Sequence, residues 1–471
     1  MNIEGNILSY LDRKQELLTN LAKDIWYHPQ IALQEIYAAK VSADLLQKEG
    51  FSITKEVGNM PTAFIASWGK GKPIVGILGE YDALPGLSQK VSTKKEAIED
   101  RKPGHSCGHN LLGVGSLGAT LAIKEAMKNN DIKGTIRYYG CPAEETLVGK
   151  VFMAKSGVFN DLDASITWHP MNLNTLWNSS CLAMNSFKLN FYGIAAHAAG
   201  MPEKGLSALD GVILTDIGVN YLREHVAQET RIHCVITNGG LAPNVVPEYA
   251  QVWYFVRAPH RDQVEKVYSK ILDIAKGAAL MTGTTVDTEF ITGCHEYLPN
   301  SVLGEIIYKN LLKVGAPKFT EEERKFAQEL EATMPTGSFQ TMLKSSGLTP
   351  EEVGGFLSDK ILEKDGGPLS KGKIMKGSTE VGDVSFITPT AQFGTTCWPF
   401  SLAEHSWQTT ASTGSSIGSK GMIIAAKTLA LSAFDLLTKP DILKKAQNEF
   451  KKTIGGKKYI SPLPEKLNSP M

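Results

Sequence analysis

Residues 73–86, PIVGILGEYDALPG, contain a run of apolar residues that leads directly into the acidic residue Asp82. The run predicts a strand over 73–78 that is covered on both faces, because such a strand has no polar alternation. In α/β sheets, ligand sites lie just beyond the carboxyl ends of the strands. The segment therefore predicts both a sheet and the place of a functional site.

Strand and helix patterns alternate on either side of this segment. Helical spacing in the first fifty residues predicts two amphipathic helices, the second over 33–49, and residues 111–127 predict an apolar helix. Further apolar runs predict strands at 62–66, 134–139 and 164–168. The alternation predicts an α/β fold with a mostly parallel sheet covered by helices.

A different pattern occupies residues 182–292. It has the order βαββαβ, which is typical of a ferredoxin-like domain. The predicted strands are 185–192, 231–237, 250–257 and 285–291, and the predicted helices are 207–225 and 262–281. We therefore expect a catalytic domain over 1–181 and 293–471, with a lid or dimerisation domain inserted between its two parts. Residues 317–376 predict a helical insertion with a loose loop near 364–373.

The composition limits the possible partners. The chain has 471 residues, which predicts at least two domains, and Lys+Arg and Asp+Glu are equal at 49 each. A chain without net charge has no bulk attraction to nucleic acid or to an anionic membrane. Residues 421–437 are apolar but contain Lys427 and Asp435, which predicts a buried helix. The start lacks the features of a signal peptide, and the six cysteines form no CxxC pair, so we expect reduced thiols and a cytoplasmic protein.

Residues able to bind metal fall in loops at the predicted strand ends. The segment GHSCGHN, 104–110, places Cys107 two residues before His109, and CPAEE, 141–145, ends in Glu144 and Glu145. Each segment also has an ordinary explanation, since Asn110 suits a helix cap and glutamates suit a solvated helix start.

Two histidines complete the set of candidates. His169 ends a predicted strand and His405 lies in LAEHSW, 402–407. Together the segments supply one thiolate, three imidazoles and a carboxylate, which is the donor set of a dinuclear hydrolytic centre. Asp82 is placed to orient a ligating histidine.

These motifs occur in the order that marks a known family. YDALP at 81–85, CGHN at 107–110 and PAEE at 142–145, followed by His169 and His405, resemble the two-domain metallopeptidases that include aminoacylase, carboxypeptidase G, hippurate hydrolase and the auxin-conjugate amidohydrolases. The likeness is to the branch with a cysteine ligand. APNVVP, KGAALMT and STEVGDVS are similar to a group within it that carries a long insertion and acts beside a related second subunit.

The resemblance implies a role for each matching residue. Two divalent ions, manganese or zinc, would be bound by five ligands: Cys107, His109, Glu145, His169 and His405. Glu144 would be the general base for a water bridging the ions, and Asp82 would orient a ligand. His197 of the lid would stabilise the oxyanion in a partner subunit's site, and Asn244 and Arg257 would contact substrate.

The implied reaction is cleavage of the amide bond of an N-acyl amino acid, with p-aminobenzoyl-glutamate or a similar acyl-glutamate as the expected substrate. A dipeptidase or aminoacylase of the same family remains an alternative. A thiol amidase with Cys107 as nucleophile and His109 or His105 as base, or a non-catalytic partner subunit, remains open as well. We expect a homodimer or a heteromer with a related subunit. Departures from the family pattern, at Glu80, Asn110 and Leu112, bear on the substrate more than on the metal ligands.

Overall fold

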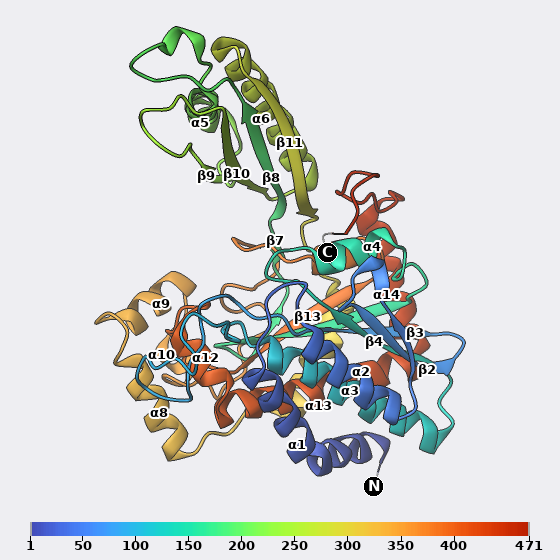
Figure 1. Ribbon diagram of the computed structural model, residues 1–471. Coiled ribbons are helices and arrows are strands. Elements are labelled where there is room, and N and C mark those ends of the chain that lie inside the picture. Colours follow the sequence, from blue (N-terminus) through green and yellow to red (C-terminus); the bar gives the residue numbers. More distant parts are fainter. Residues whose placement is uncertain (1, 470–471) are drawn as a thin grey trace.

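A seven-stranded sheet forms the centre of the larger domain in the computed structural model, which describes residues 2–469 (Figure 1). Its strand order is β1-β2-β4-β3-β5-β13-β6. The bounds are β1 Ser52–Lys55, β2 Phe64–Lys70, β3 Ile74–Glu80, β4 Gly134–Cys141, β5 Ala164–Met171, β6 Thr175–Trp177 and β13 Thr390–Thr396. The central four strands are parallel to one another, whereas the outer pairings are antiparallel. The predicted α/β fold is confirmed, and its parallel part is the part that carries the site.

Helices cover the two faces of this sheet unequally. One face packs against long helices: α1 Ile3–Tyr27, α2 Ile36–Lys48, α3 His109–Asn130, α7 Ser301–Val314 and α13 Ser416–Thr438, with α12 Trp407–Thr413 and α14 Pro440–Ile454 beside them. The other face packs against the short helices α4 Gly149–Lys155 and α11 Val381–Ser385 and a C-terminal segment. Residues of β3 alternate between the two cores, Val75 and Ile77 on one side and Ile74 and Leu78 on the other. Both faces of the sheet are therefore dry, as the unbroken apolar strands predicted.

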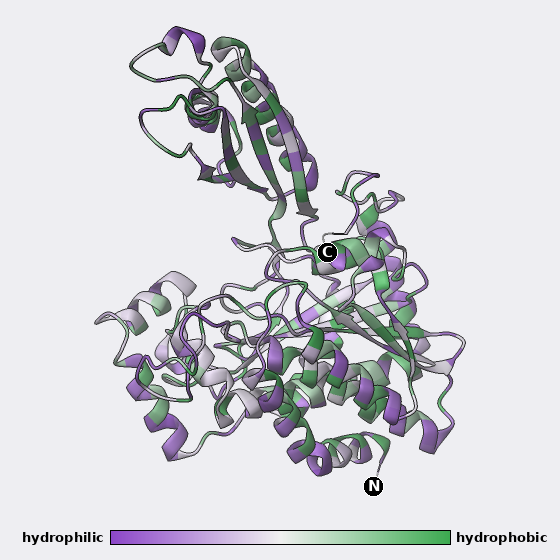
Figure 2. Cartoon of the chain, in the orientation of Figure 1, coloured by the Kyte–Doolittle hydropathy of each residue, from purple (hydrophilic) through white to green (hydrophobic). Residues whose placement is uncertain are grey.

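Helix α13 is the one helix within residues 2–469 whose length and composition would suit a membrane span. In the structure, 78% of its most apolar window is buried, and it packs against α3, α7 and α1. Figure 2 shows its apolar colour continuing into the strands and helices around it. The predicted buried helix is confirmed. All six cysteines are free, and Cys234 alone among them is exposed.

The start of α3 lies against the end of β3. Gly113 permits this approach, because a Cβ there would lie 2.6 Å from the carbonyl oxygen of Glu80. Ser116 donates a hydrogen bond to the carbonyl of Leu78 at 2.7 Å. Helix α3 begins at His109, two residues earlier than the apolar pattern predicted, so His109 belongs to the first helical turn and Cys107 to the bend before it.

The second domain has the predicted βαββαβ order and stands away from the first (Figure 1). Its elements are β8 Ala183–Tyr192, α5 Ala208–Leu222, β9 Arg231–Asn238, β10 Tyr249–Ala258, α6 Arg261–Thr282 and β11 Thr285–Cys294. The sheet order is β11-β8-β10-β9 with every pairing antiparallel, which is the ferredoxin-like arrangement. Strand β9 has one neighbour, β10, so its outer edge is free.

The predicted helical insertion contains α8 Glu321–Glu331, α9 Ser338–Ser346 and α10 Pro350–Val353. An irregular segment follows and ends in β12 Ile374–Met375, which pairs with β7 Ser180–Cys181. Backbone N–H groups of Asn178, Ser180 and Leu182 donate to carbonyls of residues 369, 373 and 377 at 2.9–3.0 Å. The insertion therefore ends alongside the segment that leads into the second domain.

Candidate metal centre and substrate pocket

Asp82, just after β3, joins two of the predicted site segments. One carboxylate oxygen accepts a hydrogen bond from Nδ1 of His109 at 2.8 Å, and the other accepts from the backbone N–H of Glu145 at 2.9 Å. Since Nδ1 of His109 carries the proton, Nε2 presents a lone pair to the interior of the site. Asp82 therefore has the orienting position that the sequence predicted.

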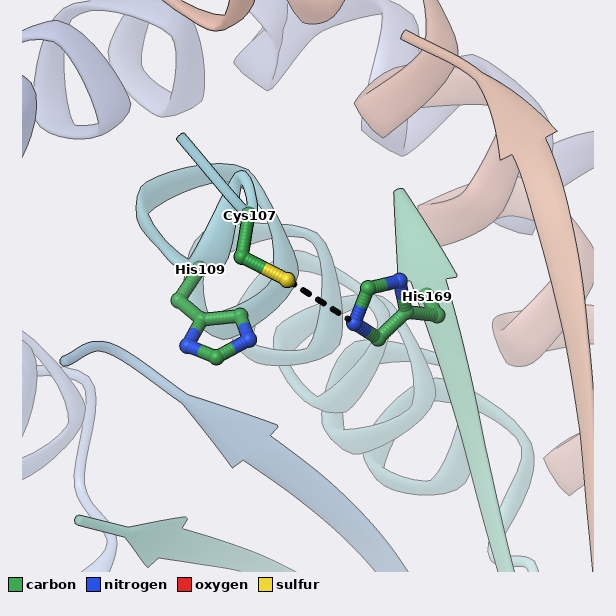
Figure 3. A group of neighbouring side chains, drawn as sticks. All are labelled: Cys107, His109 and His169. Carbon is green, nitrogen blue, oxygen red and sulfur yellow. Dashed lines mark hydrogen bonds between the residues drawn. The ribbon is translucent and has the colours of Figure 1, made fainter. Parts of the chain in front are cut away.

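Cys107 and His169 lie on the other side of His109 (Figure 3). The thiol of Cys107 is 3.5 Å from Nε2 of His169, whose Nδ1 donates to the carbonyl of Pro170 at 2.6 Å. The rings of His109 and His169 are 5.8 Å apart and nearly perpendicular. One donor atom from each of these three residues lies within 4.8 Å of the others, a spacing that suits a single ion.

A second group of donors shares the same thiol. Cys107, Glu145 and His405 also place one donor atom each within 4.8 Å of one another, and Nε2 of His405 is 3.4 Å from a carboxylate oxygen of Glu145. His405 is half-exposed, whereas Glu145 is nearly buried. The five predicted ligands are thus brought together as two adjoining groups with Cys107 common to both.

Unpartnered buried atoms test whether these residues fit metal. Nε2 of His109, one oxygen of Glu145 and one oxygen of Glu80 are buried without a hydrogen-bond partner. All three offer lone pairs, so they cannot hydrogen-bond to one another in these protonation states, and a cation between them satisfies them. Thiolate and imidazole suit zinc, and carboxylate suits manganese. The residues fit two divalent cations.

The electrostatics of the site point the same way. Burial, followed by repulsion from Glu80, raises the pKa of Glu144 well above its usual value, and burial raises the pKa of Glu145 to about 7. Burial and the charge of Glu145 also raise the pKa of the Cys107 thiol. Bound cations reverse these tendencies, because they stabilise the anionic forms.

The turn that carries the two glutamates has a strained backbone. Ala143 and Leu147 both have φ near +56°, in the left-handed region that residues other than glycine rarely adopt. The buried carboxylate of Glu35 accepts from the N–H of Ala143 at 2.8 Å and from the hydroxyl of Thr62 at 3.0 Å. Sequence reasoning missed Glu35, because nothing near it in the chain marks it as a partner of this turn.

A cavity of about 260 Å³ opens from the metal-binding groups. Its apolar wall includes Met171, Trp177, Phe255 and Met375, and Arg257 of β10 also lines it. Within residues 2–469 Arg257 makes no ion pair, and its Nε is buried without a partner. Arg257 is therefore an uncompensated cation in a pocket that otherwise holds acidic and apolar groups.

His197 and Asn244 do not line this cavity; both are exposed on the second domain. Nδ1 of His197 accepts from the N–H groups of Ala199 and Gly200 at 3.2 and 2.9 Å, which leaves Nε2 as an outward-facing donor. The predicted role of His197 requires a second copy of the chain, so it stays a prediction.

The structure also bears on two alternatives from the sequence. Asn110 is not a helix cap, since Gly108 occupies the N-cap position of α3 and the Asn110 amide donates to the carbonyl of Ala22. The thiol of Cys107 hydrogen-bonds to His169, a histidine that the thiol-amidase hypothesis did not include. Three further buried charged residues next to the site, Glu80, Lys150 and Glu380, had no predicted role.

Comparisons with known proteins agree with this geometry. Residues 183–281 match the family model described as M20_dimer, a peptidase dimerisation domain. One of the two subunits of the p-aminobenzoyl-glutamate hydrolase of Escherichia coli (strain K12) is 39% identical over 464 residues, which cover 97% of this chain and 96% of that protein. The other of these two subunits is 26% identical over 243 residues, 49% of this chain and 55% of that protein. The Xaa-Arg dipeptidase of Homo sapiens is 28% identical over 477 residues, 96% of this chain and 92% of that one.

Solved structures show the same fold. A putative aminohydrolase from methicillin resistant Staphylococcus aureus superposes with a TM-score of 0.64 at 16% identity, over 92% of this chain and 100% of that chain. A dinuclear metal-binding peptidase from the M20 family of Bacillus subtilis superposes with a TM-score of 0.58 at 15% identity, over 90% of this chain and 99% of that chain.

Replacing Cys107 and His169 together by alanine should remove the metal. Both donor groups include Cys107, so the double variant leaves neither group with three donors. We expect the wild-type protein to carry up to two divalent ions per chain after dialysis and the variant to carry far fewer, as measured by elemental analysis. Full metal content in a folded double variant would show that the ligand assignment is wrong.

Proposed function

Because the chain belongs to the M20 family of metallopeptidases and amidohydrolases, we propose that it hydrolyses the amide bond of an N-acyl amino acid, with p-aminobenzoyl-glutamate as the preferred substrate. The observation that carries the proposal is a single cavity in which two metal-binding groups face an unpaired arginine. A metal centre acts on the amide, and an arginine binds the carboxylate of the amino acid. The relative that is 39% identical over nearly the whole chain is named for that substrate.

The metal centre supplies the activation of water. Two divalent ions lower the pKa of a shared water molecule from about 15.7 toward 7 and polarise the scissile carbonyl. Glu144 lies beside this centre, with a carboxylate oxygen 3.8 Å from Nε2 of His109. Its raised pKa suits a group that takes a proton from the attacking water and delivers it to the leaving amine. Glu145, the next residue, belongs to a donor group and anchors this part of the turn.

The cavity also suits an aromatic acyl group. The ring of Trp177 is 6.2 Å from the ring of His169, so an aromatic surface lies beside the metal centre. Met171, Phe255 and Met375 extend that surface, and Arg257 lies over the ring of Phe255, with its guanidinium carbon 5.1 Å from the ring centre. An acyl-glutamate can therefore place its ring against apolar side chains while its carboxylate reaches the guanidinium.

A dipeptidase is the second candidate, because the Xaa-Arg dipeptidase of Homo sapiens also matches most of the chain. The charge of Arg257 disfavours a substrate with a cationic side chain at that end of the pocket. Five free buried cysteines, one of them a proposed ligand, fit a reducing compartment, and we place the enzyme in the cytoplasm.

A substrate panel tests the proposed reaction. With manganese or zinc added, the purified protein should hydrolyse p-aminobenzoyl-glutamate faster than N-acyl arginines or dipeptides with a cationic side chain, as measured by release of the free amine. A metal chelator should abolish turnover, and added metal should restore it. Turnover that survives complete metal removal would instead support the thiol amidase, and no turnover of any N-acyl amino acid would support a non-catalytic role.

Replacing Glu144 by glutamine tests the general base. The amide keeps the size of the side chain but loses the basic oxygen, so turnover should fall by roughly 10²–10⁴-fold while metal content and substrate affinity survive. Glu145→Gln is the matched variant, and it should weaken metal binding instead. If both glutamates were merely solvated residues at a helix start, each variant would lose less than about 1 kcal/mol of stability and no activity. Near-normal turnover in Glu144→Gln would refute the mechanism.

We further propose that the second domain forms a dimer. The free edge of β9 lies next to exposed apolar residues of β9 and α5, including Tyr221, which is 74% exposed, and Val235, which is 54% exposed. Unpaired edges and apolar patches of this kind are normally covered by a partner. The match of residues 183–281 to a peptidase dimerisation domain supports a second copy of the chain as that partner. A related but different chain is the alternative, since the Escherichia coli hydrolase has two similar subunits.

Mixing of variant chains tests whether His197 acts in the partner's site. An inactive His197→Ala chain and an inactive Glu144→Ala chain should recover partial activity when mixed, because the hybrid dimer contains one site with both residues intact. Exchange is followed independently by size-exclusion chromatography of differently tagged chains. Exchange without recovered activity would rule out the role across the dimer, and a strictly monomeric protein would rule out the homodimer.

A further inference from the structure

A buried lysine links two glutamates immediately behind His109. Lys150, in the first turn of α4, is fully buried, and its Nζ lies 2.6 Å from one oxygen of Glu80 and 3.1 Å from one oxygen of Glu380. Glu80 ends β3, and Glu380 directly precedes α11. The three charges thus come from separate elements that meet at this point.

Pairing within this cluster does not account for all of its charge. Burying an ammonium group requires a counter-charge, and one carboxylate supplies it. Here two carboxylates surround one ammonium, so the cluster keeps a net negative charge in the interior. Glu380 is satisfied within the cluster, since its other oxygen accepts from the backbone N–H of Lys150 at 3.3 Å. The excess charge therefore falls on Glu80.

The second oxygen of Glu80 faces the metal-binding residues. This Oε2 is buried without a hydrogen-bond partner and lies 3.5 Å from Nε2 of His109, which is also buried without a partner. The proton of His109 is on Nδ1, which donates to Asp82, so Nε2 and Oε2 present lone pairs to each other. Glu144 Oε2 lies 3.8 Å from the same nitrogen. One donor atom each from Glu80, His109 and Glu144 lies within 4.8 Å of the other two.

We propose that Glu80 is a sixth protein group of the metal centre, which contributes Oε2 to the cation bound by His109, and that Lys150 and Glu380 hold its carboxylate in place. The inference rests on the proposed metal-dependent function. Lys150 occupies Oε1, so Glu80 offers one oxygen rather than two. An additional carboxylate makes the centre harder and more negative, which favours manganese over zinc.

The test measures metal binding without substrate. Glu80→Gln keeps the size of the side chain but replaces the anionic oxygens, and it should weaken binding of Mn²⁺ at one of the two sites by about 10–100-fold, the range typical of a group that supports a metal site. Binding of Zn²⁺ should weaken less. Affinities are obtained by titration against a chelator of known affinity, with the fold of each variant checked by circular dichroism.

Glu380→Gln is the matched control, because it removes the other carboxylate of Lys150 but none of the donor atoms near His109. Its Mn²⁺ affinity should change much less than that of Glu80→Gln. Equal losses in the two variants would mean that Glu80 only balances Lys150, and wild-type Mn²⁺ affinity in Glu80→Gln would overturn the proposal.

A further variant covers the case in which Glu80→Gln does not fold. The pair Glu80→Gln with Lys150→Met removes the buried ammonium together with its partner, and it should show the same loss of Mn²⁺ affinity. Normal affinity in that folded variant would also overturn the proposal. Failure of the proposed function is distinguishable, because in that case the wild-type protein itself would bind no divalent ions.

Discussion

The site depends first on the two hydrogen bonds of the Asp82 carboxylate. They join the end of β3 to the first residue of α3 and to the turn after β4, three segments that have no other reason to adopt a common geometry. Because one oxygen fixes the tautomer of His109 and the other fixes the backbone of Glu145, a single side chain sets the direction of a nitrogen donor and the position of a carboxylate donor. The sheet makes this possible, since β3 and β4 are parallel neighbours that end side by side.

That arrangement concentrates negative charge where solvent does not reach it. Five carboxylates, those of Glu80, Asp82, Glu144, Glu145 and Glu380, surround the site, and Lys150 is the one buried lysine beside them. Left-handed backbone at Ala143, Leu147 and His405 adds local strain of about 1–3 kcal/mol per residue. The surrounding core must offset these costs, and the helices α1, α3 and α13 pack an extensive apolar core against the sheet beneath the site. Bound cations remove most of the repulsion, so the site and its metal stabilise each other.

Local sequence signals account for most of the fold and for the metal ligands. Apolar runs and helical spacing located the strands and helices to within a few residues, because both depend on which face of an element is buried. The ligands lie in short motifs at strand ends, and those motifs were recognisable in sequence order. Lys150, by contrast, lies in GKVFMAK, a stretch that is typical of an ordinary amphipathic helix start. Its partner Glu380 is 230 residues away, and no local pattern records that contact. The same holds for Glu35, which acts on Ala143 from a distant segment.

The position of the second domain decides whether the pocket is complete. Phe255 and Arg257 belong to β10 of that domain, whereas the metal-binding groups belong to the first domain, so the cavity wall spans both. The chain enters the second domain through residues 178–182, and the end of the insertion is hydrogen-bonded to that segment at Asn178, Ser180 and Leu182. The same stretch of the insertion contributes Met375 to the cavity. A change in the insertion therefore alters both a wall of the pocket and the support of the segment that carries Arg257, which links substrate fit to the placement of the lid through a few backbone hydrogen bonds.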